Sequence, residues 1–235
     1  FLVIGNPIDH SLSPKLHNYW IKINNIKAIY EKEKLENNQI ENLILKIKKK
    51  EISGINVTVP FKKTENTYID ELNFVAKRTK SVNTIYLDKE KTVGHNTDIE
   101  GFEKSINDLN FDVKNKRILI LGAGGVVPSI IFALEKMKVS RITVSNRTKE
   151  KAENLKKLFK DLSIIRWGQI EDFDMIINAT SLGLREKDKI DLDFSQIGKG
   201  KLFYDVIYNP SETNFLKKGK NFGNKIENGL KMFIY

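Results

Sequence analysis

The chain has 235 residues, of which 40% are hydrophobic and 30% charged, and it carries a formal net charge of +10 without any cysteine. Its length and composition are typical of one large or two smaller globular domains, and the lack of cysteine excludes a disulfide framework and thiolate chemistry. No apolar run reaches the roughly 18 to 20 residues of a membrane span and no signal peptide is visible, so we expect no membrane partner. We expect a cytoplasmic protein, with a targeting segment before Phe1 as the alternative.

The positive charge is compatible with nucleic-acid binding only if the basic residues gather on one surface. The lysines are scattered, and the short run at residues 48–50 ends an amphipathic helix, where cations are favourable. We therefore expect no nucleic-acid partner, and a basic nucleic-acid-binding protein stays the alternative from another class.

The chain opens with a predicted strand over residues 1–4 and a turn. Ser11 and Ser13 follow, and an extended loop can point two hydroxyls two residues apart towards one ligand. The alternative is that they cap the next helix, and without further context we favour the cap. A strand around Ile29-Tyr30 and a helix over about 38–49 come next.

An apolar strand that ends at Pro60 carries Asn56 and Thr58, and Lys62 follows it. A lysine in this position can hold a substrate hydroxyl or move a proton, if burial or another cation lowers its pKa. The alternative is one more surface lysine among many, which position alone favours.

A further strand is predicted over residues 81–86, with Asn83 near its start. Asp98 begins a connecting helix over about 98–110. It can cap that helix, act as a base, or form an ion pair with Lys62.

His10 and His17 are the first candidates for metal ligands. No third ligand lies near them in the sequence, and His17 fits a helix histidine whose hydrogen bonds are satisfied. We expect no metal site.

The strongest single signal is a basic pair, Lys116-Arg117, followed by an apolar run over residues 118–121 that ends in a glycine turn and leads into a helix. Such a run suits a buried strand of a parallel sheet. The glycines allow the backbone to approach a phosphate at the positive end of the helix. The turn consists of Gly122, Ala123, Gly124 and Gly125, followed by Val126. A plain tight turn is the alternative, because the full G-x-G-x-x-G pattern is not present.

A second strand is predicted over residues 141–145, and Asn146, Arg147, Thr148 and Lys149 follow it. In a dinucleotide fold this position meets the adenosine ribose, where an acidic residue selects NAD and an arginine accommodates the 2′-phosphate of NADP. Because Arg147 and Lys149 stand there instead of a carboxylate, we predict NADP. Exposed cations with no ligand are the alternative.

Short apolar strands near residues 164–165, 175–177 and 202–204 continue the alternation of strand and helix that indicates a parallel sheet. Asn178-Ala179-Thr180 closes one of them, at the edge where α/β folds bind ligands. A polar turn without a role is the equal alternative.

A series of short motifs, in one order and nearly from end to end, resembles the shikimate dehydrogenase family. The motifs are Gly5-Asn6-Pro7-Ile8 with Ser11-x-Ser13-Pro14, Asn56-Val57-Thr58-Val59-Pro60-Phe61-Lys62, Val82-Asn83-Thr84, Asn96-Thr97-Asp98, Gly122-Ala123-Gly124-Gly125, Asn146-Arg147-Thr148, Asn178-Ala179-Thr180-Ser181-x-Gly183, and Tyr204-Asp205-Val206-Ile207-Tyr208-Asn209-Pro210 with Thr213 and Phe215-Leu216.

The resemblance implies an NADP-dependent oxidoreductase that reversibly reduces 3-dehydroshikimate to shikimate, in the pathway to chorismate and the aromatic amino acids. It implies that Lys62 and Asp98 form the catalytic pair. The residues it implies for substrate binding are Ser11, Ser13, Asn56, Thr58, Lys62, Asn83, Asp98 and Tyr208. Those it implies for NADP are Gly122, Ala123, Gly124, Gly125, Val126, Asn146, Arg147, Thr148, Lys149, Thr180, Ser181, Leu182 and Val206.

The expected fold is α/β with two lobes. Residues 1–98 form the substrate-binding catalytic domain, residues 99–209 form a Rossmann-like NADP domain, and residues 210–235 pack back on the first domain. A small-molecule substrate and a monomer or homodimer are expected.

Two other enzymes remain as alternatives. A quinate/shikimate dehydrogenase of broader specificity is close, because one hydroxyl and one double bond separate the substrates. A methylenetetrahydrofolate dehydrogenase-like enzyme shares the two lobes but would need an aromatic-lined slot that the sequence does not indicate.

Overall fold

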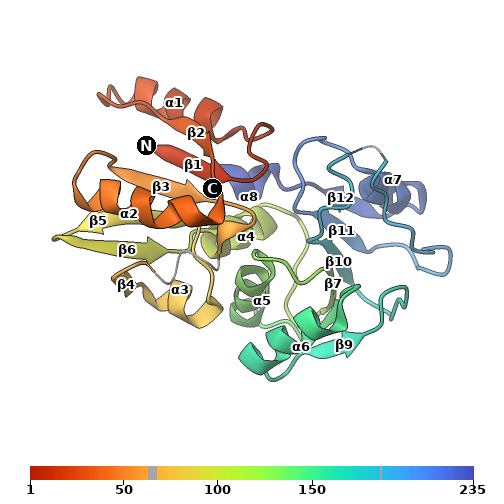
Figure 1. Cartoon of the computed structure of the whole chain (residues 1–235). Helices are drawn as coiled ribbons and strands as arrows, with labels where there is room; N and C mark the ends of the chain where they lie inside the picture. The colour runs from red at the N-terminus through yellow and green to blue at the C-terminus, as the bar shows by residue number, and fades with distance from the viewer. Residues whose placement is uncertain (63–67, 186) are drawn as a thin grey trace. The chain divides into compact units, whose positions relative to one another are not determined.

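The chain folds into two compact units, Phe1–Thr97 and Asp98–Tyr235, each with its own sheet (Figure 1). The computed structural model describes residues 1–62, 68–185 and 187–235. The predicted α/β class with two lobes is confirmed. No helix in the described part of the chain is long and apolar enough to cross a membrane.

The first unit contains a mixed six-stranded sheet in the order β2-β1-β3-β5-β6-β4. Strands β2 and β3 run parallel to β1, whereas β5 runs antiparallel to β3 and to β6. Its elements are β1 (Leu2–Gly5), α1 (Ser13–Ile23), β2 (Glu31–Lys34), the 3-10 helix η1 (Asn37–Gln39), α2 (Ile40–Lys48), β3 (Gly54–Val57), β4 (Glu71–Leu72), α3 (Phe74–Thr79), β5 (Thr84–Asp88) and β6 (Lys91–His95).

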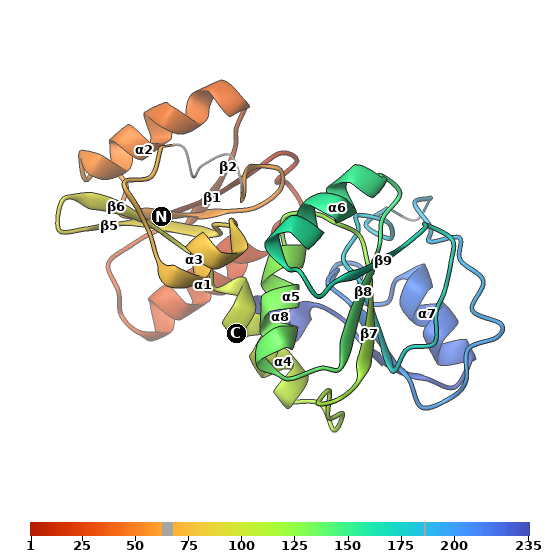
Figure 2. The ribbon, with the colours of Figure 1, turned by 90° about the horizontal axis from the view of Figure 1, so that it is seen from below.

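Helices α1 and α2 cover opposite faces of this sheet (Figure 2). Successive residues of a strand point to opposite faces, so Ile4 belongs to the core cluster that includes Ile44 of α2, while Val3 packs with Ile8 and Tyr30 on the α1 side. The apolar stripe of α2 is fully buried, as the periodicity over 38–49 predicts.

The second unit contains a six-stranded sheet in the order β12-β11-β10-β7-β8-β9, and every pair in it is parallel. Counted from β7, this is the 3-2-1-4-5-6 order of a Rossmann fold. Its elements are α4 (Asp98–Asn107), β7 (Arg117–Leu121), α5 (Val127–Lys136), β8 (Arg141–Ser145), α6 (Lys149–Leu158), β9 (Ser163–Ile165), β10 (Met175–Asn178), β11 (Leu202–Asp205), α7 (Asn214–Asn221), β12 (Lys225–Glu227) and α8 (Leu230–Ile234).

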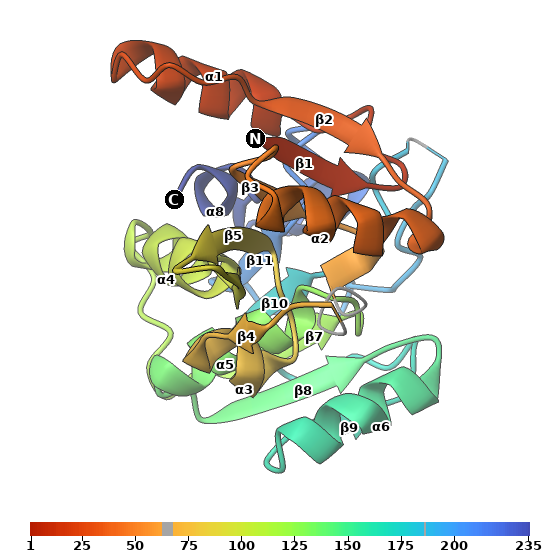
Figure 3. The ribbon, with the colours of Figure 1, turned by 60° about the vertical axis from the view of Figure 1, so that its left-hand side comes forward.

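Strands β11, β10, β7 and β8 lie side by side (Figure 3), and α5 and α6 cover one face of the sheet while α7 covers the other. Burial on both faces explains the unbroken apolar run over residues 118–121, which is 0–1% exposed. Pro128 lies in the first turn of α5, where its missing N–H costs little.

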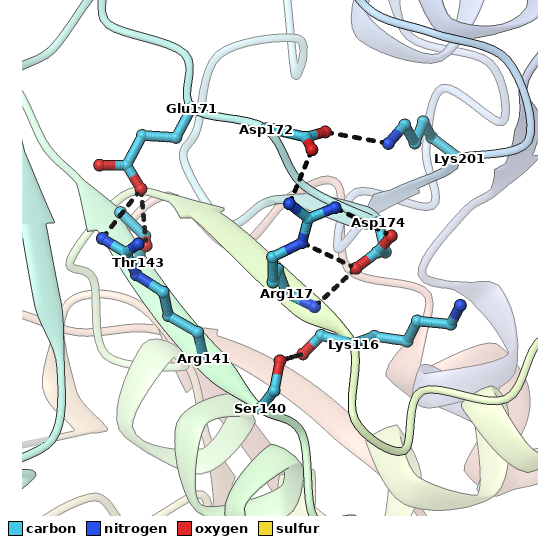
Figure 4. Close-up of polar contacts among 9 residues, drawn as sticks. All are labelled: Lys116, Arg117, Ser140, Arg141, Thr143, Glu171, Asp172, Asp174 and Lys201. Carbon is cyan, nitrogen blue, oxygen red and sulfur yellow. Dashed lines mark hydrogen bonds and ion pairs between the residues drawn. The ribbon is translucent and has the colours of Figure 1, made fainter.

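The amino ends of the parallel strands are joined by ion pairs (Figure 4). The Arg117 guanidinium contacts Asp172 at 2.6 Å and Asp174 at 3.3 Å, and Lys201 also contacts Asp172, at 3.1 Å. Hydrogen bonds from Lys201 and then Arg117 hold the pKa of Asp172 below its usual value. These groups link β7, β10 and β11 at the edge opposite to their carboxyl ends.

Two predicted strands begin later than expected. The strand placed around Ile29-Tyr30 is β2, which starts at Glu31, because the backbone N–H and C=O of Tyr30 bond to the Asn18 side chain. The strand placed over 81–86 is β5, which starts at Thr84. The N–H of Val82 bonds instead to the carbonyl of Lys62.

The residues after Asn209 make contacts within the second unit. Helix α7 packs on β11 and β12, and α8 packs on α4. A Cβ atom at Gly101 of α4 would lie 2.6 Å from the Met232 carbonyl oxygen, so this glycine permits the close approach of α8. The expected packing of residues 210–235 on the first lobe, and the boundaries at 98 and 209, stay predictions.

Candidate active site

The carboxyl ends of four parallel strands form one row in the second unit. Leu121 of β7 is in register with Ser145 of β8 and with Asn178 of β10, and Asn178 is in register with Asp205 of β11. Each residue predicted to bind the cofactor follows one of these strand ends. Ligands of open α/β sheets bind at this edge.

The glycine turn after β7 lies against the end of β10. Gly122 has a φ of +112°, and a Cβ atom there would lie 2.7 Å from the carbonyl oxygen of Ala179. Both the conformation and the space require glycine. A Cβ atom added at Gly124 would have its nearest neighbour 3.8 Å away, which leaves the backbone of the turn open to a ligand at the start of α5.

The loop after β8 presents cations at the same edge. Arg147, Thr148 and Lys149 are exposed, and α6 begins at Lys149. The Asn146 side chain donates a hydrogen bond to the Thr148 carbonyl at 2.7 Å, which shapes the loop. A planar guanidinium can bind phosphate oxygens through two hydrogen bonds, so these residues fit the 2′-phosphate of NADP.

The turn after β10 is fixed by the Asn178 side chain. Its oxygen accepts hydrogen bonds from the backbone N–H and the hydroxyl of Thr180, at 3.1 and 2.7 Å. Its nitrogen donates to the Leu182 carbonyl at 3.1 Å and to Asp205 at 3.0 Å. The predicted nicotinamide-side residues Thr180, Ser181 and Leu182 therefore belong to one hydrogen-bonded turn.

Asp205 is a buried carboxyl at the base of this turn. Burial raises its pKa to about 6, and hydrogen bonds from Thr213, the Ile207 N–H and Asn178 oppose that rise. Val206 follows it, and its N–H donates to the Asn178 carbonyl at 3.0 Å. Asp205 thus joins the ends of β10 and β11.

In the first unit, small polar side chains predicted to bind substrate are linked by hydrogen bonds. The Ser11 hydroxyl donates to Ser13 at 3.2 Å. The Asn56 amide nitrogen donates to Thr84 at 3.0 Å, and the Thr84 hydroxyl donates to Asn83, also at 3.0 Å. The helix-cap alternative for the two serines holds only in part. Leu12, and neither serine, is the N-cap of α1, but the Ser11 hydroxyl accepts a hydrogen bond at 3.3 Å from the backbone N–H of Ser13, the first residue of the helix.

Lys62 and Thr58 are anchored beside these residues through their backbones. The Lys62 carbonyl accepts from the N–H of Val82, next to Asn83. The Thr58 N–H donates to the Ile4 carbonyl of β1 at 2.9 Å. Both residues are half-buried.

The other two predicted substrate residues belong to the second unit. Asp98 is the first residue of α4 and directly follows Thr97, whose hydroxyl accepts a hydrogen bond from Asn83 at 2.9 Å. The Tyr208 ring stacks on Phe233 of α8, with centroids 4.6 Å apart. These positions assign each residue to its own unit, and the pairing of Lys62 with Asp98 stays a prediction.

Sequence reasoning missed Tyr30 and Thr84 as members of the hydrogen-bonded group. The Tyr30 hydroxyl donates to Asn56 at 2.6 Å, although the sequence pattern places this residue only in a strand. A buried tyrosine needs a partner for its hydroxyl, and that rule is the signal available in the sequence.

His17 is one of the two histidines considered as metal ligands. Its ring stacks on the Tyr30 ring, with the ring centroids 4.1 Å apart and an angle of 3° between the ring planes. Burial lowers the pKa of His17. Within residues 1–62, 68–185 and 187–235, no three His, Asp or Glu side chains are grouped so that they could hold a metal ion.

Family models match both units of the chain. The model of the shikimate dehydrogenase substrate binding domain matches residues 3–85, and the model of shikimate / quinate 5-dehydrogenase matches residues 104–186. A shikimate dehydrogenase (NADP(+)) of Pelagibacter ubique is 58% identical over 235 residues, which are 100% of this chain and 89% of that protein.

Solved structures share the fold. The crystal structure of shikimate dehydrogenase from Aquifex aeolicus has a TM-score of 0.92 at 37% identity, over 99% of this chain and 86% of that one. Shikimate 5-dehydrogenase from Thermus thermophilus, in complex with NADP(H) and shikimate, has a TM-score of 0.91 at 28% identity. The match covers 99% of this chain and 88% of that one.

The Rossmann-like sheet with its glycine turn and basic loop, together with a separate unit rich in short polar side chains, defines a dinucleotide-dependent oxidoreductase. The sequence and structural matches make the class more specific. The chain belongs to the shikimate dehydrogenase family. The family, the oxidoreductase class and the NADP cofactor predicted from the motifs are confirmed.

Proposed function

We propose that the chain catalyses the reversible, NADP-dependent reduction of 3-dehydroshikimate to shikimate, a step towards chorismate and the aromatic amino acids. The observation that carries this proposal is the hydrogen-bonded group of Ser11, Ser13, Asn56 and Asn83 in a chain of this family. A small acid with three hydroxyls needs several short donors and acceptors, and these side chains supply them.

NADPH, when bound, supplies the hydride. Gly122, Gly124 and the start of α5 would hold its pyrophosphate, and Arg147 with Lys149 would hold the 2′-phosphate. The fixed turn of Thr180, Ser181 and Leu182 would line the nicotinamide side.

Lys62 is the proposed general acid. Negative charge develops on the carbonyl oxygen of the substrate during reduction, and an ammonium group beside it stabilises that charge and donates the proton. Asp98 would orient the ammonium group. The position of the Lys62 backbone beside Val82-Asn83 supports this role, because Asn83 is part of the polar group.

A quinate/shikimate dehydrogenase of broader specificity is the second candidate, since the matching family model covers both substrates. We further propose a cytoplasmic enzyme that acts as a monomer or homodimer.

The test is a spectrophotometric assay of nicotinamide reduction by the purified chain, with shikimate or quinate and with NADP⁺ or NAD⁺. We expect turnover with shikimate and NADP⁺ and a much lower kcat/KM with quinate. Comparable kcat/KM for the two substrates would favour the broader enzyme. No turnover with either substrate, together with salt-sensitive binding to DNA, would contradict both enzymes.

A further inference from the structure

Tyr30 is a buried residue that none of the functional assignments above uses. Its side chain is 4% exposed, yet its hydroxyl lies among the side chains proposed to bind substrate. It donates a hydrogen bond to the Asn56 side-chain oxygen at 2.6 Å and is hydrogen-bonded by the Ser13 side chain. Burial raises the pKa of Tyr30, so the phenol stays protonated and can donate.

Helix α1 holds Tyr30 at three points. The Asn18 side chain donates to the Tyr30 carbonyl at 2.7 Å and accepts from its N–H at 3.0 Å. The His17 ring stacks on the phenol ring with a centroid distance of 4.1 Å. The backbone and the ring of Tyr30 are therefore fixed before any ligand arrives.

The hydrogen bonds around Tyr30 run in one direction. Tyr30 donates to the Asn56 oxygen, so the Asn56 nitrogen must point the other way. That nitrogen donates to the Thr84 hydroxyl at 3.0 Å and to the Asn83 carbonyl at 3.3 Å. The series continues from the Thr84 hydroxyl to Asn83 and from Asn83 to Thr97.

This arrangement decides what Asn56 can bind. Both protons of its amide nitrogen are used, and one lone pair of its oxygen accepts from Tyr30. The remaining lone pair can only accept a hydrogen bond. Its partner in a ligand is then a hydroxyl and not a carboxylate.

We propose that Tyr30 is a positioning residue of the substrate site, which fixes the Asn56 carboxamide as an acceptor for a substrate hydroxyl and orients the Ser13 hydroxyl beside it. The proposal rests on the proposed function, because shikimate and 3-dehydroshikimate carry the hydroxyls. Tyr30 contributes to substrate affinity and takes no part in the proton or hydride transfer.

The test compares Tyr30→Phe with the wild type in the assay of shikimate oxidation by NADP⁺. Phenylalanine keeps the stack on His17 and removes only the hydroxyl. We expect the KM for shikimate to rise about tenfold, the loss of roughly one well-formed hydrogen bond. The kcat and the KM for NADP⁺ should not change, because the interaction is made equally in the ground and transition states.

Two further variants separate positioning from simple folding support. Thr84→Val removes the acceptor of the Asn56 amide and should raise the KM for shikimate as well. In an Asn56→Ala background, Tyr30→Phe should add little to the KM, because the two residues act through one contact. Tyr19→Phe is the matched control, since Tyr19 lies on α1 and is 60% exposed.

The outcomes are distinct. A wild-type chain that does not reduce NADP⁺ with shikimate would overturn the proposed function and the role of Tyr30 with it. An active wild type with an unchanged KM for shikimate in Tyr30→Phe and in Thr84→Val would overturn the role of Tyr30 alone. A lower melting temperature of these two variants with an unchanged KM for shikimate would also overturn the role of Tyr30 alone.

Discussion

The Asp205 carboxylate at the end of β11 accepts a hydrogen bond from the Asn178 amide at the end of β10, at 3.0 Å. Both side chains are fully buried. The same carboxylate accepts from the Thr213 hydroxyl at 2.6 Å and from the Ile207 N–H at 3.0 Å. One carboxyl group therefore joins two strand ends to Thr213, the N-cap of α7.

Replacement of Asp205 by Ala should destabilise the protein strongly. Three buried donors lose their acceptor, and each unsatisfied group costs about 1–3 kcal/mol. We expect a loss of at least about 3 kcal/mol in the free energy of unfolding, measured by urea titration. Asp205→Asn keeps an acceptor oxygen and should cost less. If Asp205→Ala lowered the free energy of unfolding by no more than the exposed control Asp191→Asn, the stabilising role of Asp205 would be contradicted.

Asp205 should also give a characteristic pH dependence of stability. Its pKa is about 6 in the folded protein, whereas the ordinary pKa of an aspartate, 3.8, applies to the unfolded chain. Between these values the folded state binds more protons than the unfolded state, so this group makes the free energy of unfolding fall as the pH rises from about 4 to 6. Other carboxylates act in the opposite direction, and the difference between wild type and Asp205→Asn isolates the effect. A pH-independent difference would argue against the raised pKa.

The second unit follows closely from its sequence, and the first does so less well. The unbroken apolar runs and the glycine turn predict β7, α5 and β8 with nearly correct bounds, because a parallel strand buried on both faces leaves a continuous apolar signal. The predicted beginning of β2 is wrong at Tyr30, whose backbone bonds to a side chain of α1. Such long-range contacts leave no periodic pattern.

In the candidate site, too, the residues marked by local sequence patterns could be predicted, whereas those joined by long-range contacts could not. Local signals place Gly122 and Arg147 at the ends of adjacent parallel strands, and the register of Leu121 with Ser145 brings those ends together. The links through Tyr30 and Thr84 depend on the packing of α1 against β1 and β2 and on the pairing of β3 with β5. Neither this helix packing nor this strand pairing can be predicted from the spacing of residues along the chain.

Lys62→Ala should reduce kcat by about a hundredfold to ten-thousandfold, the range of a general acid. The KM for shikimate should stay nearly unchanged, because the charge that Lys62 is proposed to stabilise develops in the transition state. Lys62→Arg should be almost as slow, since a guanidinium does not give up its proton at neutral pH. Steady-state kinetics checks both, with exposed Lys49→Ala as the control. Near-wild-type kcat in Lys62→Ala would remove Lys62 from the mechanism.

Arg147→Ala should change the choice of cofactor. Hydrogen bonds to a charged group contribute about 1.5–3 kcal/mol, so the KM for NADP⁺ should rise roughly ten- to a hundredfold. The KM for NAD⁺, which has no 2′-phosphate, should not change. Kinetics with both cofactors checks this, and Lys160→Ala, an exposed cation beyond the end of α6, is the control. An equal rise for both cofactors would place Arg147 elsewhere than at the 2′-phosphate.

Gly101→Ala should disturb the contact between α4 and α8. An added Cβ atom would lie 2.6 Å from the Met232 carbonyl oxygen, and backbone cannot move aside as a flexible side chain can. Overpacking of this kind costs about 1–3 kcal/mol, more than the helix propensity of alanine returns. We expect a melting temperature lower by roughly 2–8 °C.

Gly198→Ala is the matched control for this variant, because the nearest atom to its added Cβ is 3.9 Å away. The displacement of α8 should also reach Tyr208, whose ring stacks on Phe233 of that helix. We therefore expect Gly101→Ala to raise the KM for shikimate as well as lower the melting temperature, whereas Gly198→Ala should change neither. A Gly101→Ala protein as stable as Gly198→Ala would show that α8 does not depend on the close approach at this glycine.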